Sequence, residues 1–117
     1  MMKISNESRA ILLAARAEVA KSFWSRLWGL MGRASLPHDT ALVIVPNSSV
    51  HTFWMRFPID VIFVDRNDIV VGLREAMPPN RPYAGAWKAY RTIELPAGVI
   101  QRTGTQRGDR LRFEALG

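Results

Sequence analysis

The segment IDVIFVDRNDIVVGL, from Ile59 to Leu73, is the strongest indication of the fold class of this chain. Two apolar runs rich in β-branched residues, Ile59–Val64 and Ile69–Leu73, flank four polar residues of the kind that form tight turns. The pattern predicts a β-hairpin with its turn at residues 65–68.

Further segments outward from this hairpin are strand-like. Before it, Val50–Met55 alternates its side chains between two faces, and the short apolar run Ala41–Val45 stops at Pro46. After it, Ala89–Leu95 and Leu111–Ala115 are strand candidates, separated by a turn at 96–98 and one helical turn. The proline-rich stretch 77–82 between them predicts a loop.

One segment has helical rather than β periodicity. The apolar residues Phe23, Leu27, Leu30 and Met31 recur at helical spacing, which predicts a short amphipathic helix over residues 23–31. Residues 10–20 are ambiguous, because their alanine content favours a helix whereas their alternation favours a strand.

These elements predict a mainly β fold, α+β at the margin, with an antiparallel sandwich-like or barrel-like sheet and one short helix. The length of 117 residues fits one domain. We expect a polar N-terminal tail at residues 1–9 and a single domain over residues 10–117.

Composition excludes several classes of function. With 48% hydrophobic and 22% charged residues the chain is typical of a globular protein, and without cysteine it can form neither a disulfide nor a thiolate site. Neither a secretory leader nor a long apolar span is recognisable, so we expect a cytoplasmic protein without a membrane span, and no cofactor or metal. A monomer or weak homodimer is the expected assembly.

The net charge is +6, from 13 Arg and 3 Lys against 10 acidic residues. Such a surplus attracts anionic partners weakly. The arginines are nevertheless scattered along the chain, and the densest group, residues 102–112, also contains Asp109. The pattern favours a solvated basic surface over a nucleic-acid footprint, and we expect a small-molecule or protein partner instead.

Four motifs in order carry a family resemblance: RLWGLMGR at 26–33, VHTFWMRFPIDVIF at 50–63, ELPAG at 94–98 and Gly108-Asp109. Together they resemble the family known as domain of unknown function 192, over residues 10–113. The resemblance implies a compact sandwich or jelly-roll-like β fold and favours strand for residues 11–20. It implies no established activity.

One departure from the family pattern is informative. Relatives often carry a cysteine before the His-Thr pair and another before the Glu-Leu-Pro motif, where this chain has Asn47 and a residue near Ala86. A disulfide, metal or thiol function shared by the family is therefore excluded for this member.

Polar side chains that could bind a ligand concentrate at residues 51–60. His51 could act as an acid, a base or a hydrogen-bond donor near neutral pH, and Arg56 could grip a carboxylate or phosphate. Asp60 follows a Pro-Ile pair, which favours an extended backbone and a carboxylate held in one direction. Trp54 could wall such a pocket, together with Trp87, and Arg26 could hold an anion.

A structural interpretation, which we favour, exists for these residues other than Arg56. His51 could pack against the core, and Asp60 could tie down a turn by accepting N–H bonds. The two tryptophans could be core or rim residues, and Arg26 could pair with Glu94.

The leading hypothesis is a small, non-enzymatic binding or accessory domain with a polar pocket around His51, Arg56 and Asp60. Its alternatives are a metal-free enzyme that uses His51 and Asp60 as acid and base, and a basic nucleic-acid-associated or scaffold module.

Overall fold

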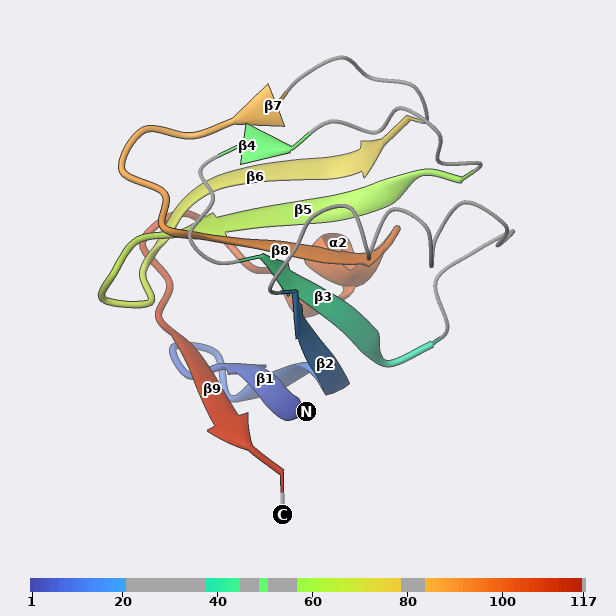
Figure 1. Ribbon diagram of the computed structural model, residues 1–117, viewed down its shortest axis with the longest axis vertical. Helices are drawn as coiled ribbons and strands as arrows, with labels where there is room; N and C mark the ends of the chain where they lie inside the picture. Colours follow the sequence, from blue (N-terminus) through green and yellow to red (C-terminus); the bar gives the residue numbers. More distant parts are fainter. Residues whose placement is uncertain (21–37, 45–48, 51–56, 79–83, 117) are drawn as a thin grey trace.

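The computed structural model describes residues 1–20, 38–44, 49–50, 57–78 and 84–116. Its elements are nine strands and one short helix among these residues (Figure 1). They run in the order β1 (Met2–Asn6), β2 (Ile11–Ala20), β3 (Thr40–Ile44), β4 (Ser49–Val50), β5 (Ile59–Val64), β6 (Val70–Met77), β7 (Ala84–Gly85), β8 (Arg91–Pro96), α2 (Val99–Thr103) and β9 (Leu111–Ala115).

Seven strands form one sheet in the order β6-β5-β8-β3-β2-β1-β9, and β4 pairs with β7 in a small second sheet. All neighbours in the large sheet are antiparallel except β2 and β3, which are parallel. The predicted mainly β class is confirmed, with this one parallel pair as an addition.

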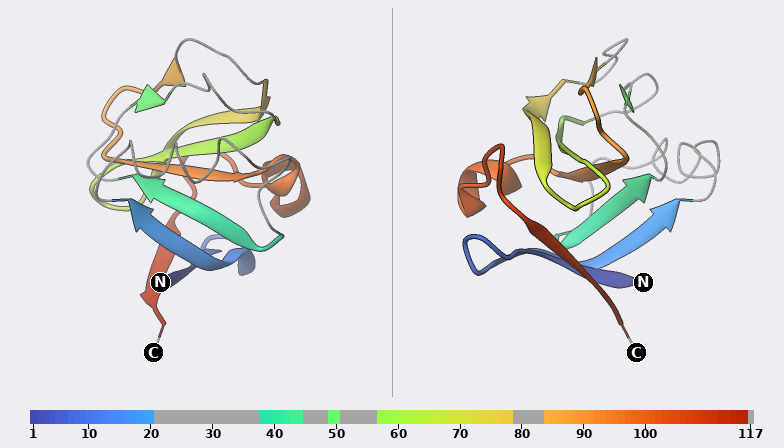
Figure 2. Two further views of the ribbon diagram at one scale, coloured as in Figure 1. Left: turned by 45° about the vertical axis from the view of Figure 1, so that its right-hand side comes forward. Right: turned by 90° about the vertical axis from the view of Figure 1, so that its left-hand side faces the viewer.

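The large sheet curls so that its two outer strands meet at one end (Figure 2). An isolated bridge joins Ile69 to Arg110, and the Val70 N–H donates to the Asp109 carbonyl at 2.9 Å. This contact pairs backbone groups that an open sheet edge would leave exposed, and it makes the sheet barrel-like at that end.

Strand β5 explains how the sheet is covered on two faces. Its six residues are all buried, because alternate side chains belong to different apolar clusters. Ile62 and Val64 face the inside of the curl, where α2 contributes Val99 and Ile100. Phe63 faces the other side, in a cluster with Leu42, Phe57, Ile59, Val61 and Met77.

The predicted hairpin is confirmed, with β5 and β6 paired across the turn at 65–68. The strands expected at 41–45, 89–95 and 111–115 correspond to β3, β8 and β9, and the helical turn after Gly98 is α2. The strand that the family resemblance favoured over residues 11–20 is β2. The helix predicted at 23–31 lies outside the described residues.

The prediction of a tail at residues 1–9 is wrong for Met2–Asn6. These residues form β1, which pairs with both β2 and β9 inside the sheet, and Ile4 and Asn6 are fully buried. The sequence does contain a strand pattern here, because the apolar residues Met2 and Ile4 alternate with Lys3 and Ser5 before turn-forming residues. The polar composition of residues 1–9 concealed this pattern.

Candidate functional site

Asp60, which the sequence singled out, is fully buried and bonded to the backbone. Its Oδ1 accepts the Ala76 N–H at 2.7 Å, and its Oδ2 accepts the N–H groups of Gly98 and Ile100 at 3.1 and 2.8 Å. The carboxylate therefore joins β6 to the turn that begins α2.

The register of the sheet explains this position. Asp60 lies opposite Leu95 on β8, one residue before the turn at 96–98. It also shares a face of β5 with Ile62 and Val64, which is the face that α2 covers. A side chain from this point therefore reaches the first N–H groups of α2.

The third donor comes from an irregularity in β6. The pairing of β5 with β6 shifts between Ile59 and Val61, so that two residues, Glu75 and Ala76, lie opposite Asp60. Ala76 adopts a positive φ of 46°. A bulge removes its extra residue from the ladder, and the Asp60 carboxylate accepts the N–H that this bulge frees.

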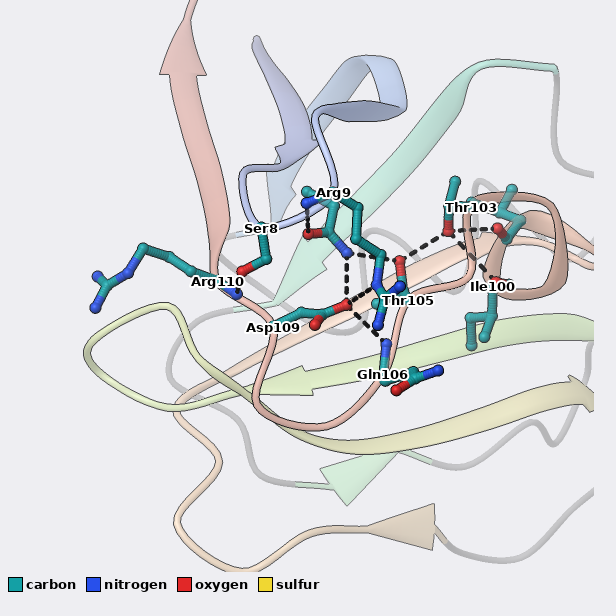
Figure 3. Close-up of polar contacts among 10 residues, drawn as sticks. Ser8, Arg9, Ile100, Thr103, Thr105, Gln106, Asp109 and Arg110 are labelled. Atoms are coloured by element: carbon teal, nitrogen blue, oxygen red, sulfur yellow. Dashed lines mark hydrogen bonds and ion pairs between the residues drawn. The ribbon is translucent and has the colours of Figure 1, made fainter.

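A second buried carboxylate, Asp109, follows α2 in the chain and lies within a network of polar contacts (Figure 3). Its Oδ2 accepts hydrogen bonds from Asn6 Nδ2 at 2.9 Å, Arg9 Nε at 2.6 Å and the Gln106 N–H at 3.0 Å. Asn6 Nδ2 also donates to Thr105 Oγ1 at 3.1 Å. This network ties β1 and its turn to the segment before β9.

The network continues from Thr105 into α2. The hydroxyls of Thr105 and Thr103 lie 2.7 Å apart, and Thr103 Oγ1 is 2.8 Å from the Val99 carbonyl oxygen (Figure 3). Gly108, the residue before Asp109, has a φ of 90° in the turn that precedes β9. The sequence analysis does not predict Asn6 and Arg9 as partners of Asp109, because it places residues 1–9 in a tail.

The electrostatics of Asp109 follow from these contacts. Burial by itself raises the pKa of its carboxyl. The hydrogen bonds from Arg9, Asn6 and Gln106, with the Arg9 charge, outweigh burial, and the pKa lies below the ordinary value of 3.8. Asp109 is therefore ionised in the neutral range, and its donors belong to the protein itself.

The other residues of the predicted pocket, His51, Trp54, Arg56 and Arg26, lie outside the described residues. The structure thus gives no distance between His51 and Asp60, and their grouping stays a prediction. For Asp60 alone, the geometry corresponds to the structural interpretation, in which the carboxylate ties down a turn. Trp87 is 85% exposed, so it is not a core residue.

A surface hollow of about 240 Å³ opens beside the turn that Asp60 holds. We call it the α2 hollow. Arg102 and His38 bring nitrogen donors to it, and His38 Nε2 lies 3.2 Å from the Asp39 carboxylate. Apolar side chains supply the remaining wall, and the full lining is Leu13, His38, Asp39, Pro96, Ala97, Gly98, Val99 and Arg102.

Two further site classes find no support in the described part of the chain. No three His, Asp or Glu side chains gather there in a way that could hold a metal ion. No helix among the same residues is long and apolar enough to cross a membrane.

Comparison with known proteins identifies relatives along nearly the whole chain. The family model DUF192, described as Uncharacterized ACR, matches residues 3–113. A UPF0127 protein of Thermococcus sibiricus is 34% identical over 117 residues, which cover 93% of this chain and 73% of the relative. A UPF0127 protein of Pyrococcus horikoshii is 33% identical over 94% of this chain and 97% of its own length.

Two solved structures share the fold. A protein of unknown function from Novosphingobium aromaticivorans superposes with a TM-score of 0.74 at 19% identity, covering 95% of this chain and 82% of the other. A protein from Sinorhizobium meliloti described as a putative transcription regulator gives a TM-score of 0.75 at 20% identity, over 96% and 91%. At these identities the likeness concerns the fold alone.

Proposed function

This chain belongs to the DUF192 family, and we propose that it is a non-enzymatic binding domain that takes a small organic anion in the α2 hollow. The observation that carries the proposal is the contrast between its polar groups. The buried carboxylates Asp60 and Asp109 are occupied by donors of the protein itself. Arg102 and His38 instead line an open hollow, where His38 pairs with Asp39 and Arg102 donates one exposed hydrogen bond of 3.5 Å to the Leu12 carbonyl.

The occupied state of Asp60 argues against the enzyme alternative. A general acid or base needs a lone pair or proton within reach of the substrate. Both oxygens of Asp60 accept backbone N–H bonds, and the residue has no exposed surface. Proton transfer at this carboxylate would break the bonds that hold the start of α2.

The lining of the α2 hollow indicates the class of ligand. The exposed guanidinium of Arg102 offers a planar fork that suits a carboxylate or phosphate. Leu13, Pro96 and Val99 supply an apolar wall. A compact anion with an apolar body fits this combination better than a bare inorganic ion, and the small volume excludes a large ligand.

Asp60 has an indirect part in this proposal. Its bonds to Gly98 and Ile100 fix the turn that forms one wall of the hollow. These two N–H groups are thereby used and are not available to the ligand. We infer that Asp60 positions the wall, and that Arg102 provides the contact.

The pocket expected around His51, Arg56 and Asp60 remains a competing location for the same function. The description of the Sinorhizobium meliloti protein as a putative transcription regulator does not extend to this chain, because the likeness at 20% identity carries the fold only. The α2 hollow and the predicted pocket can be distinguished by substitution. Arg102→Gln should abolish binding in the α2 hollow, and His51→Ala or Arg56→Ala should abolish binding in the predicted pocket.

A thermal-shift titration tests the function and its location together. The probes are inorganic phosphate and a panel of short-chain, branched and aromatic monocarboxylates. We expect at least one monocarboxylate to raise the melting temperature in a saturable way, because a ligand that binds only the folded state stabilises it. Arg102→Gln should abolish this increase without changing the melting temperature of the free protein.

Arg112→Gln is the matched control, because Arg112 is an exposed arginine of β9 that does not line the hollow. A ligand effect that survives Arg102→Gln but disappears in His51→Ala or Arg56→Ala would move the site to the predicted pocket. Saturable stabilisation by none of the probes would refute the proposed function.

A further inference from the structure

The loop between β7 and β8 carries a tight turn with two large side chains at its tip. The Ala89 N–H donates to the Ala86 carbonyl at 3.3 Å, which closes a four-residue turn around Trp87 and Lys88. Both central residues are exposed, and Trp87, at 85%, is more exposed than any other large apolar residue described. We call this the Trp87 turn.

The residue choice in this turn is locally unfavourable. Lys88 adopts a φ of 68°, in the left-handed region where glycine or asparagine is preferred. A tryptophan in water also leaves a large apolar surface uncovered. Backbone strain at Lys88 and the exposure of Trp87 occur in one surface turn. Together they indicate that these side chains have a role other than stabilising the fold.

A surface hollow adjoins the Trp87 turn. Arg66 stacks over the Tyr90 ring, with its guanidinium carbon 4.3 Å from the ring centroid. The hollow measures about 360 Å³, and we call it the Tyr90 hollow. The β5–β6 turn and the β7–β8 loop form it together, because the Tyr90 N–H donates to the Val64 carbonyl at 2.7 Å. Its lining is Asp65, Arg66, Asn67, Lys88, Ala89 and Tyr90.

The lining of the Tyr90 hollow carries two cations, Arg66 and Lys88, and one acid, Asp65, so its net charge is positive. Asp65 Oδ1 accepts the N–H groups of Asn67 and Ile69, at 2.8 and 3.0 Å. Asp68 pairs with Arg91. Arg66 and Lys88 line the hollow without an acidic partner among the described residues, so the open face offers cations beside aromatic rings.

We propose that the Tyr90 hollow and the Trp87 turn form a binding surface for single-stranded nucleic acid. Unpaired bases stack on exposed aromatic rings, and cations between those rings follow the phosphates. Trp87 supplies the exposed ring, and Arg66 and Lys88 supply the cations, with Arg66 stacked over the half-buried ring of Tyr90. Binding of this kind depends little on base sequence, because every base has an aromatic face.

An anionic lipid surface is the main competing partner, and the distribution of apolar groups argues against it. Membrane insertion needs a contiguous apolar area. Of the other exposed large apolar residues of the described chain, Leu12 and Val19 lie in β2, and Met1 and Leu116 lie next to the ends of β1 and β9. Trp87 is therefore not part of a larger exposed apolar area among the described residues, and it adjoins a cationic hollow.

This surface could not be expected from the sequence, which favoured a solvated basic face. Its cations are few and lie in two loops, 65–67 and 87–90, separated by the whole of β6. It is also independent of the α2 hollow, which has a different lining.

Fluorescence anisotropy with labelled single-stranded oligonucleotides of uniform sequence tests the proposal. We expect binding at low ionic strength that weakens by at least about tenfold between roughly 50 and 200 mM salt. Trp87→Ala should weaken it by about tenfold or more, and Trp87→Phe should restore most of the loss. Because Trp87 is exposed, its substitution should not unfold the protein, so a loss of affinity would not come from a folding defect. Circular dichroism of each variant checks that the fold is kept.

Lys88→Gly gives a readout that a structural role could not produce. Removal of the strained side chain should raise the melting temperature, whereas removal of the cation should lower the affinity severalfold. Arg16→Gln is the control, because this exposed arginine of β2 is separated from the hollow by β3, β8 and β5 in the sheet. It should change affinity by less than about twofold.

Three results would overturn the proposal. One is the absence of oligonucleotide binding at low salt. The second is binding that Trp87→Ala leaves unchanged, or that Arg16→Gln weakens equally. The third is binding to vesicles of anionic phospholipid, lost in Trp87→Ala, by a protein that binds no oligonucleotide.

Discussion

Asp60 and Asp109 are both buried carboxylates that connect separate parts of the chain, but they do so with different partners. Asp60 accepts only backbone N–H groups, from Ala76, Gly98 and Ile100. Asp109 accepts two side-chain donors and one backbone N–H, and one of those side chains is the partly exposed cation Arg9. Asp60 therefore fixes backbone geometry in the interior, whereas Asp109 forms an ion pair near the surface.

The difference shows how a charged group can be structural in two ways. Neutral N–H donors in a buried site have no alternative partner, so the loss of their acceptor leaves them unsatisfied. A cation near the surface can turn to water when its partner is removed. Substitution should therefore lower the free energy of unfolding more at Asp60 than at Asp109. The ionic contribution of Asp109 should make the free energy of unfolding depend on pH.

The largest expected effect is that of Asp60→Ala. It leaves three backbone N–H groups without an acceptor, and we expect the free energy of unfolding to fall by about 3 kcal/mol or more. Urea unfolding measures this loss. Asp65→Ala is the matched control, because Asp65 also accepts two backbone N–H groups but lies in a turn that water reaches, and it should cost no more than about 1 kcal/mol. Equal losses in the two variants would contradict the account.

Asp109→Ala should have an intermediate effect of about 2 kcal/mol. Asn6 Nδ2 and the Gln106 N–H lose an acceptor, but Arg9 remains free to be hydrated. Arg9→Gln should cost about 1 kcal/mol. Because the two residues share one network, the double variant should lose less than the sum of the single losses. Strict additivity in urea unfolding would show that the ion pair contributes nothing.

The pH dependence of stability should reveal the ionic contribution of Asp109. The pKa of Asp109 is lowered in the folded state, so its contribution is complete above the ordinary value of 3.8 and is lost as the pH falls through that value toward the folded pKa. The difference in unfolding free energy between the wild type and Asp109→Asn should therefore narrow between about pH 5 and pH 2. A difference that stays constant over this range would exclude the ionic contribution.

The smallest expected effects concern two alanines with positive φ, namely Ala76, whose N–H donates to Asp60, and Ala10, which follows the Asp109 partner Arg9. Ala76 has a φ of 46° in the β6 bulge, and Ala10 has a φ of 51° at the end of the β1–β2 turn. Glycine adopts this region without steric strain, although it loses more backbone entropy on folding. Ala76→Gly and Ala10→Gly should each stabilise the fold by up to about 1 kcal/mol, measured as an increase in melting temperature. Destabilisation by either one would show that the positive φ carries no strain.

The sequence predicts those parts of the fold that depend on local pattern. The β5–β6 hairpin was predicted because its strands and its turn are adjacent in the chain. The strand β1 was missed because its polar composition conceals the alternation of Met2 and Ile4 with Lys3 and Ser5, although β1 pairs with the adjacent strand β2. Its second partner, β9, comes from the opposite end of the sequence, and no local pattern predicts that pairing. Residues 11–20 were ambiguous for a different reason, since periodicity does not separate an alanine-rich strand from a helix.

The site shows the same limit. Asp60 was recognised as a held carboxylate from the residues that precede it, but its donors depend on a bulge in β6 and on the turn after β8. Asp109 was noted as part of a family motif, and its link to Asn6 requires β1 to lie in the sheet. Contacts between residues far apart in the sequence, rather than residue types, account for what was missed.

Native-state hydrogen exchange at the amides of Ala76, Gly98 and Ile100 tests most directly the claim that Asp60 is a structural clamp. Amides that donate to a buried acceptor exchange only when the surrounding structure opens. We predict exchange as slow as that of the β8 amides Ile93 and Leu95. Exchange as fast as that of exposed Trp87 and Lys88 would mean that this carboxylate does not hold the turn, and that it is free for other chemistry.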